Sequence, residues 1–216
     1  MPCSHGPESR KRIILFNGPP GCGKDTAANI IHEKLITLSY KYKMAQPLKE
    51  ACHKLLGLEG TLEELESVKE LPIKFLVTNP SLAVIESGPL TNDVGEMTLR
   101  QFYIHVSENM MKPLFGNDVF GRSAVEYLRQ THQIVSTVSD AGFVDEVQPI
   151  IDYFGEDRVC LVRIHRTGKT FKGDSRKYVD LPLKYVMDIH NDNDLDAFAD
   201  VLWRKISKNF LNGIQI

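Results

Sequence analysis

This sequence of 216 residues has no long apolar run and no large excess of charge of either sign. No stretch approaches the roughly 18 consecutive apolar residues of a membrane-spanning helix, which argues against a membrane protein. The first residues are polar and basic, and they lack the apolar segment of a signal peptide. We therefore expect residues 1–11 to be a disordered tail and the protein to be cytoplasmic.

Cysteine is scarce, and its four copies are not spaced as metal ligands. Cys3, Cys22, Cys52 and Cys160 form no C-x-x-C pair, and no pair of histidines lies near them. Zinc binding is therefore not expected, and the pattern is typical of reduced thiols in a cytosol.

The overall composition is that of an ordinary globular protein, with 42% apolar residues, 25% charged residues and a net charge of -2. A chain of this length predicts a single domain over residues 1–216 with room for an inserted segment. The near-neutral charge argues against a dedicated nucleic-acid-binding protein, but it leaves room for a local basic groove.

The most informative stretch is Asn17–Thr26, which reads N-G-P-P-G-C-G-K-D-T. An apolar run, 13–16, leads into it, and apolar residues at helical spacing follow it. Strand, glycine loop and helix with a lysine at its start is the arrangement that holds a polyphosphate on backbone N–H groups and a helix N-terminus. We therefore expect Gly21, Cys22, Gly23 and Lys24 to bind ATP, with Lys24 at the β- and γ-phosphates.

One position departs from the usual phosphate-binding loop. The residue after the lysine is ordinarily Ser or Thr, whose hydroxyl binds Mg²⁺, but here it is Asp25, with Thr26 one place later. Two functional interpretations stay open for Asp25: it holds Mg²⁺ through water, or it faces the acceptor and receives its proton. The structural alternative is a helix cap without a ligand.

Strand and helix patterns alternate along the rest of the chain, which predicts an α/β fold with a parallel sheet and helices on both faces. The insertion expected over 59–96 is acidic and broken by prolines, and it includes one arm of a hairpin at 82–85. Strands are expected at 13–16, 40–44, 133–138, 159–164 and 186–189, and helices at 24–38, 47–56, 98–115, 118–130, 144–153 and from 195 onward.

Two later segments carry candidate functional residues. Asp140 directly follows a β-branched run, and the carboxyl end of a parallel strand is where a Mg²⁺-organising carboxylate belongs; the alternative is the N-cap of the next helix. Segment 165–180 is rich in Arg and Lys and contains two glycines, which predicts a lid that closes over phosphates and supplies cations. A solvated basic loop is the simpler interpretation of this segment.

Several of these stretches together resemble the phage-type deoxynucleoside monophosphate kinases of the P-loop kinase fold. The most specific of them is the lysine-aspartate loop, and the others are short. The resemblance covers most of the chain apart from the tail and the insertion. The further stretches are P-L-K at 47–49, T-L-R-Q at 98–101, S-D-x-x-F-x-x-E at 139–146, R-I-x-R at 163–166 and I-x-N-D at 189–192.

The resemblance implies a five-stranded parallel sheet and Mg²⁺- and ATP-dependent phosphorylation of a deoxynucleoside 5′-monophosphate, in a host cytoplasm if phage-encoded. It implies that ATP binds Gly21, Cys22, Gly23, Lys24, Asp25, Thr26 and Asn191. The acceptor would bind Lys49, Arg100, Gln101, Lys112, Asp140 and Arg176. Arg163 and Arg166 would act with Lys24 and Asp25 in catalysis, and Asp25 and Asp140 would hold the metal. Lys49, taken alone, is also explained as a solvated surface charge.

One departure from the family leaves the acceptor open. The family often has an arginine shortly after the strand-end aspartate, whereas this chain has Gly142. A modified pyrimidine nucleotide, a hydroxymethylated base within DNA and a small phosphate that is not a nucleotide all remain as acceptors, and so does a nucleotide-binding regulatory module without turnover. A homodimer is also open, with an apolar face over 117–130 as its interface.

Overall fold

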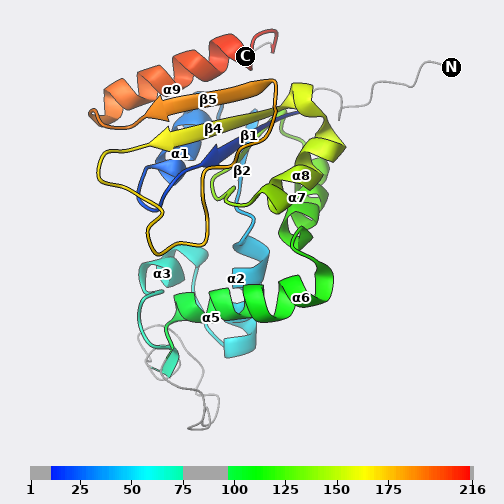
Figure 1. The fold of residues 1–216 in the computed structure, drawn as a ribbon, viewed down its shortest axis with the longest axis vertical. Helices are drawn as coiled ribbons and strands as arrows, with labels where there is room; N and C mark the ends of the chain where they lie inside the picture. Colours follow the sequence, from blue (N-terminus) through cyan, green and yellow to red (C-terminus); the bar gives the residue numbers. More distant parts are fainter. Residues whose placement is uncertain (1–10, 75–96, 215–216) are drawn as a thin grey trace, which may run out of the picture. The chain divides into compact units, whose positions relative to one another are not determined.

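The computed structural model describes residues 11–74 and 97–214. They fall into two compact units (Figure 1). Unit 1 combines the N-terminal part up to Met44 with the part from Asn117 onward, and unit 2 is the intervening segment Ala45–Gly116. The described part of the insertion expected at 59–96 lies within unit 2, and the expectation of one domain with an insertion stays a prediction.

Unit 1 contains a five-stranded sheet in the order β2-β3-β1-β4-β5. All four strand pairs are parallel, as the sequence predicts. The central strand, β1, is buried along almost its whole length because both of its neighbours and both faces of the sheet cover it. The strands are β1 (Arg12–Asn17), β2 (Ser39–Tyr42), β3 (Val135–Val138), β4 (Val159–His165) and β5 (Tyr185–His190).

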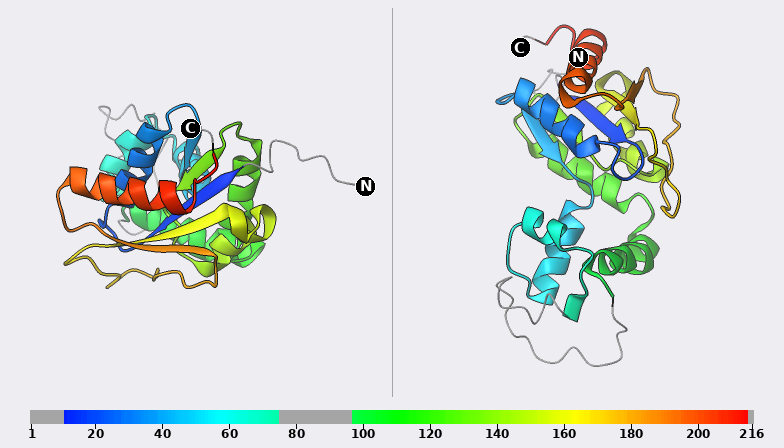
Figure 2. Two further views of the ribbon diagram at one scale, coloured as in Figure 1. Left: turned by 90° about the horizontal axis from the view of Figure 1, so that it is seen from above. Right: turned by 90° about the vertical axis from the view of Figure 1, so that its left-hand side faces the viewer.

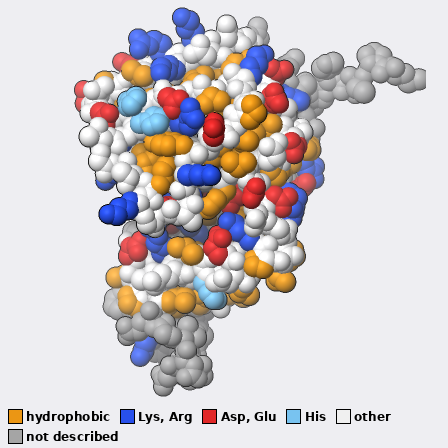
Figure 3. Space-filling model, viewed as in Figure 1, with side chains coloured by type: hydrophobic (Ala, Val, Ile, Leu, Met, Phe, Trp, Pro, Cys, Tyr) orange, Lys and Arg blue, Asp and Glu red, His pale blue; other side chains and the backbone are white. Residues whose placement is uncertain are grey.

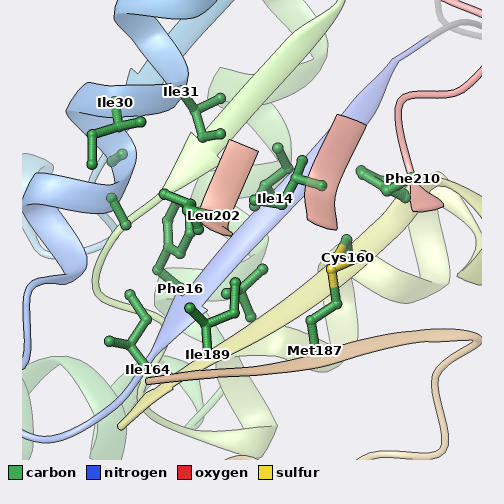
Figure 4. Close-up of a cluster of buried hydrophobic side chains, with 14 of the residues drawn as sticks. Ile14, Phe16, Ile30, Ile31, Cys160, Ile164, Met187, Ile189, Leu202 and Phe210 are labelled. Atoms are coloured by element: carbon green, nitrogen blue, oxygen red, sulfur yellow. The ribbon is translucent and has the colours of Figure 1, made fainter. Parts of the chain in front are cut away.

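Helices cover both faces of this sheet (Figure 2). On one face α1 (Lys24–Lys34) and α9 (Leu195–Asn209) pack against alternate residues of the strands, including Ile14 and Phe16 (Figure 4). The other face carries α7 (Val119–Gln130) and α8 (Val144–Phe154), followed by a single 3₁₀ turn, Glu156–Arg158. The carboxyl ends of all five strands lie at one edge, where parallel α/β sheets bind ligands.

One expectation for unit 1 changes. The first helix ends at Lys34 rather than residue 38, because Leu35 leaves the helical region and residues 35–38 form a turn into β2. The apolar face of α7, expected over 117–130 to offer a dimer interface, is already buried within the unit, and a homodimer stays a prediction. The buried residues of α7 are Phe120, Gly121, Ala124, Val125 and Leu128.

Unit 2 is helical, with α2 (Gln46–Leu56), α3 (Leu62–Ser67), α5 (Leu99–Val106) and α6 (Lys112–Phe115). Capping boxes begin α3 at Thr61 and α5 at Thr98. The single helix expected over 98–115 is interrupted by a π-helical turn, Ser107–Met111, between α5 and α6. The hairpin arm expected at 82–85 lies outside the described residues.

None of the helices in the part of the chain that the structure describes is long and apolar enough to cross a membrane.

Candidate active site

The glycine loop joins β1 to α1 at the edge where the strands end. Gly21 and Gly23 adopt positive φ angles of 72° and 105°, which side chains with a Cβ rarely adopt. Gly23 is also the N-cap of α1 and offers no side chain to the first helical N–H groups. These donors therefore remain directed at the loop, which is the arrangement that binds a phosphate.

Lys24 lies inside this loop rather than out in solvent. Its Nζ donates to the carbonyl oxygens of Gly18, at 2.7 Å, and Pro19, at 2.8 Å. Burial lowers the pKa of Lys24, and the positive charge of Arg176 lowers it further, while the Cys22 thiol opposes the change. The ammonium group is thus held by two backbone carbonyls, and a bound phosphate oxygen would replace them as its hydrogen-bond acceptor.

Asn191 supports the loop from β5. Its side chain is buried, and its Nδ2 donates to the carbonyl oxygen of Cys22 at 2.8 Å. A Cβ at position 23 would collide with this amide, so the glycine is also required by close packing. The structure therefore gives Asn191 a supporting position under the loop, and a contact with ATP stays a prediction.

Asn17 is a site residue that the sequence analysis did not single out. It is 1% exposed at the end of β1, and its Nδ2 donates to the carbonyl oxygens of Ala141, at 2.8 Å, and Lys177, at 3.2 Å. Its Oδ1 accepts a hydrogen bond from the N–H of Val179 at 3.0 Å. One amide therefore joins the end of β1 to the loop after β3 and to segment 165–180. The available signal was a polar residue at the end of an apolar run.

Asp25 faces the end of β3 and does not cap its own helix. Its Oδ1 accepts from the Ser139 hydroxyl at 2.7 Å and pairs with Lys43 Nζ at 2.9 Å. Partial desolvation favours the neutral acid, but the hydrogen bonds from Lys43 and Ser139 outweigh it and hold the pKa of Asp25 below its ordinary value. The interpretation of Asp25 as a helix cap is therefore wrong, and the carboxylate is ionised at neutral pH.

Asp140 lies beside Ser139 at the same strand end. Its Oδ1 accepts from the backbone N–H of Met44 at 2.8 Å, which ties the segment after β2 to the end of β3. The N-cap of α8 is Phe143, so the alternative interpretation of Asp140 as a cap is also wrong. Asp25 and Asp140 are thus held at one strand end, although the described residues contain no group of three side chains that could bind a metal alone.

Arg163 and Arg166 have different environments. Arg163 on β4 forms two hydrogen bonds to its register partner on β5, Asp188, at 3.0 and 2.7 Å. These bonds raise the pKa of Arg163 and use its charge within the sheet. Arg166 lies past the strand end, and its Nη1 is 3.5 Å from the carbonyl oxygen of Gly21. Of the two predicted catalytic arginines, Arg166 is the one that the structure brings to the phosphate loop.

Aromatic rings hold segment 165–180 against the strand ends. The Tyr178 ring lies 4.6 Å from that of His165 and 5.1 Å from that of Phe171, measured between centroids. The Tyr178 hydroxyl donates to the carbonyl oxygen of Ile164 at 3.2 Å. In the same segment Lys169 places its ammonium end beside Gly21. Whether the segment acts as a lid stays a prediction, but two of its cations, Arg166 and Lys169, lie at the loop.

Arg176 lies against Gly142 in the loop after β3. Its Nε and Nη2 donate to the two carboxylate oxygens of Asp174 at 2.8 and 2.5 Å. These hydrogen bonds raise the pKa of Arg176, against the effect of burial, and Asp140 and Glu146 add to the rise.

The remaining predicted acceptor residues belong to unit 2. Lys49 Nζ pairs with Glu66 at 2.6 Å, Arg100 Nη1 with Glu70 at 3.1 Å, and Lys112 Nζ with Glu108 at 2.8 Å. The Gln101 side chain accepts from the Thr98 N–H at 2.8 Å and so completes the capping box of α5. Lys49 is half-buried and also lies over the Tyr103 ring, at 5.5 Å, so it is more than a solvated surface charge.

No protein-family model and no curated protein sequence matches this chain. Among solved structures, a gluconokinase from Sinorhizobium meliloti is similar over 94% of this chain and 95% of its own, with 12% identity and a TM-score of 0.43. A sugar kinase from Janibacter sp. is similar over 93% of this chain and 97% of its own, with 11% identity and a TM-score of 0.37. A dephospho-CoA kinase from Campylobacter jejuni is similar over 94% of this chain and 100% of its own, with 14% identity and a TM-score of 0.43. Similarity this weak leaves the function to be argued from the residues of this chain.

Proposed function

We propose that this protein transfers the γ-phosphoryl group of ATP to a deoxynucleoside 5′-monophosphate. The observation that carries the proposal is the pair Lys24–Asp25: the lysine lies inside a positive-φ glycine loop, and the aspartate is hydrogen-bonded to Ser139 at the neighbouring strand end. The lysine is suited to bind the ATP phosphates, and the ionised aspartate is suited to receive a proton from the acceptor.

In the proposed reaction an oxygen of the acceptor phosphate attacks the γ-phosphorus of ATP. A new P–O bond forms, the bond from the γ-phosphorus to the β,γ-bridging oxygen breaks, and ADP leaves with the bonding electrons. A proton carried by the acceptor phosphate would pass to Asp25, whose carboxylate is ionised. Such transfers need in-line positioning and cations rather than covalent catalysis.

The cations of this chain suit that requirement. Lys24 and the first N–H groups of α1 would bind the β- and γ-phosphates, and Arg166 would neutralise charge on the transferred group. Lys49 and Arg100 would hold the acceptor phosphate after exchanging Glu66 and Glu70 for it. Arg163 would act indirectly, through the sheet, because Asp188 holds its guanidinium.

Asp25 and Asp140 fit a Mg²⁺ ion bound through water. Mg²⁺ commonly uses one or two carboxylates and completes its coordination with water and substrate phosphates, so a cage of three protein ligands is not required. When bound, the ion would neutralise charge on the β- and γ-phosphates.

The main alternative is a kinase that acts on a hydroxymethylated base within DNA. A DNA duplex would be expected to meet a continuous basic surface. Among the described residues on the face drawn in Figure 3, basic and acidic side chains are interspersed instead. Because the net charge is -2 and the described residues on this face form no such surface, we favour a mononucleotide acceptor.

A coupled assay of ADP release tests the proposal with purified protein, Mg·ATP and a panel of acceptors. We expect turnover with a deoxynucleoside monophosphate and roughly a hundred- to thousandfold loss in Lys24→Ala, a scale typical of removing one group that stabilises the transition-state charge. Thermal unfolding of this variant should match the wild type. Turnover with DNA or gluconate instead, or wild-type kcat in Lys24→Ala, would contradict the proposal.

A further inference from the structure

Gly142 and Arg176 occupy one space. A Cβ built at position 142 lies 2.8 Å from Cγ of Arg176, closer still to Cδ, and 3.5 Å from Cβ. These are atoms near the base of the arginine side chain, so the overlap cannot be relieved by turning the guanidinium alone. Any side chain at position 142 must therefore displace Arg176.

Backbone conformation does not explain the glycine. Gly142 is not among the glycines with positive φ, so alanine meets no conformational penalty there. Position 142 is buried in the short loop between β3 and α8, two residues after Asp140. Glycine is required at position 142 because Arg176 fills the space that a side chain there would need.

The arginine admitted in this way is a prepared anion site. Asp174 holds two of its nitrogens, and only about a quarter of its side chain is exposed. Its charge acts on Asp140 and on Lys24, so it belongs to the same electrostatic neighbourhood as the phosphate loop. Asp174 accepts from Nε and Nη2, so a phosphate would bind Arg176 through Nη1 or by displacing Asp174.

We propose that Gly142 is a positioning residue that admits Arg176 to the end of β3, and that Arg176 sets the affinity for the acceptor phosphate. The acceptor contact thus comes from segment 165–180 and not from the loop after β3. This inference rests on the proposed function for the identity of the acceptor, whereas the shared space is a property of the fold.

The test is a double-mutant cycle on the full chain. Arg176→Ala and Gly142→Ala should each raise the acceptor KM roughly ten- to hundredfold, the scale of a hydrogen bond to a charged group, and change the ATP KM less than about twofold. The double variant should be no worse than Arg176→Ala, since the alanine at 142 then displaces nothing. Additive effects, or a change mainly in the ATP KM, would overturn the inference. Lys208→Ala, an exposed cation near the end of α9, controls for loss of charge.

An exchange sharpens the test. Gly142→Arg should be the worst single variant, because two guanidinium groups then compete for one space. Combining it with Arg176→Gly should lower the acceptor KM at least about fivefold relative to Arg176→Gly alone, because the arginine then enters the same space from position 142. No recovery would overturn the role of Arg176 in acceptor affinity.

Failure of the proposed function is recognised separately. In that case the wild type turns over no mononucleotide, and the shared space is tested by thermal unfolding. Gly142→Ala should lower the Tm, and the lowering should vanish in the background of Arg176→Ala. An unchanged Tm in Gly142→Ala, or the same lowering in both backgrounds, would overturn the pairing.

Discussion

Each unit contains a carboxylate that holds a lysine, and the two carboxylates differ in their partners. In unit 1, Asp25 accepts from one lysine and from a serine hydroxyl at a strand end. In unit 2, Glu66 lies between two lysines, Lys49 and Lys69, one on each oxygen. In the first arrangement both contacts fall on Oδ1, whereas in the second each carboxylate oxygen binds a lysine.

This difference bears on what a phosphate would meet in each unit. Lys24 in unit 1 is held by backbone carbonyls, which a phosphate oxygen can replace without breaking an ion pair. Lys49 in unit 2 is held by a carboxylate, which an incoming phosphate must displace. Removal of a carboxylate charge should therefore have opposite consequences in the two units.

Of the carboxylate variants, Asp25→Asn is expected to have the largest effect. It keeps the size of the side chain and removes the charge, so turnover should fall roughly a hundredfold or more if Asp25 organises Mg²⁺ or receives a proton. Metal-free ATP binding should survive or tighten, because a negative charge has left the phosphate site. Steady-state kinetics and calorimetric titration with ATP measure the two quantities.

Asp145→Asn is the matched control, since Asp145 is exposed in the first turn of α8, as Asp25 is in the first turn of α1. Asp25→Ser restores an ordinary phosphate loop and should bind Mg·ATP but remain a poor kinase. Near-normal rates in both Asp25 variants would show that the charge has no catalytic part.

The same contrast marks what sequence could predict. The order of strands and helices in unit 1 and the phosphate loop follow from local patterns, because apolar periodicity, glycines and a lysine at a helix start are all read within about a dozen residues. The pairing of Arg163 with Asp188 was not predictable, because it depends on the register of β4 against β5.

Contacts between distant segments explain the other misses. Asn17 and Asn191 act on backbone groups more than a hundred residues away, and nothing in the local sequence names those partners. At Gly142 the sequence leaves open whether the family's arginine contact is lost or supplied elsewhere, and the structure shows that Arg176, from a later segment, fills the space beside Gly142. In unit 2, the sequence shows only that the stretch is acidic, whereas in the structure Glu66 from that stretch pairs with Lys49.

The second prediction concerns that pair. Glu66→Gln should lower the acceptor KM by roughly two- to fivefold, because Lys49 no longer needs to exchange a charged partner, and surface or half-buried pairs contribute about 1 kcal/mol or less. The ATP KM should stay unchanged. Glu63→Gln on the exposed side of the same helix controls for the loss of charge from α3. A raised acceptor KM in Glu66→Gln would mean that the carboxylate positions Lys49 instead of competing for it.

The smallest expected effect is a pH dependence of the stability of unit 2, caused by His53, that unit 1 should not share. His53 in unit 2 is 7% exposed and hydrogen-bonded to Tyr103 Oη at 2.5 Å. Burial lowers the pKa of His53, and Lys49 lowers it further, against Glu50 and Glu66. The unfolded chain, with a His pKa of about 6.5, therefore binds the proton more readily than the folded one. The stability of unit 2 should consequently be complete above about pH 6.5 and fall as the pH drops below it, by at most about 1.4 kcal/mol per pH unit.

Hydrogen exchange at pH 7.5 and 5.5 measures this pH dependence, with amides of β1 and β4 as the internal control. His53→Gln should flatten the response of unit 2; an unchanged pH response in that variant would assign the effect to another group.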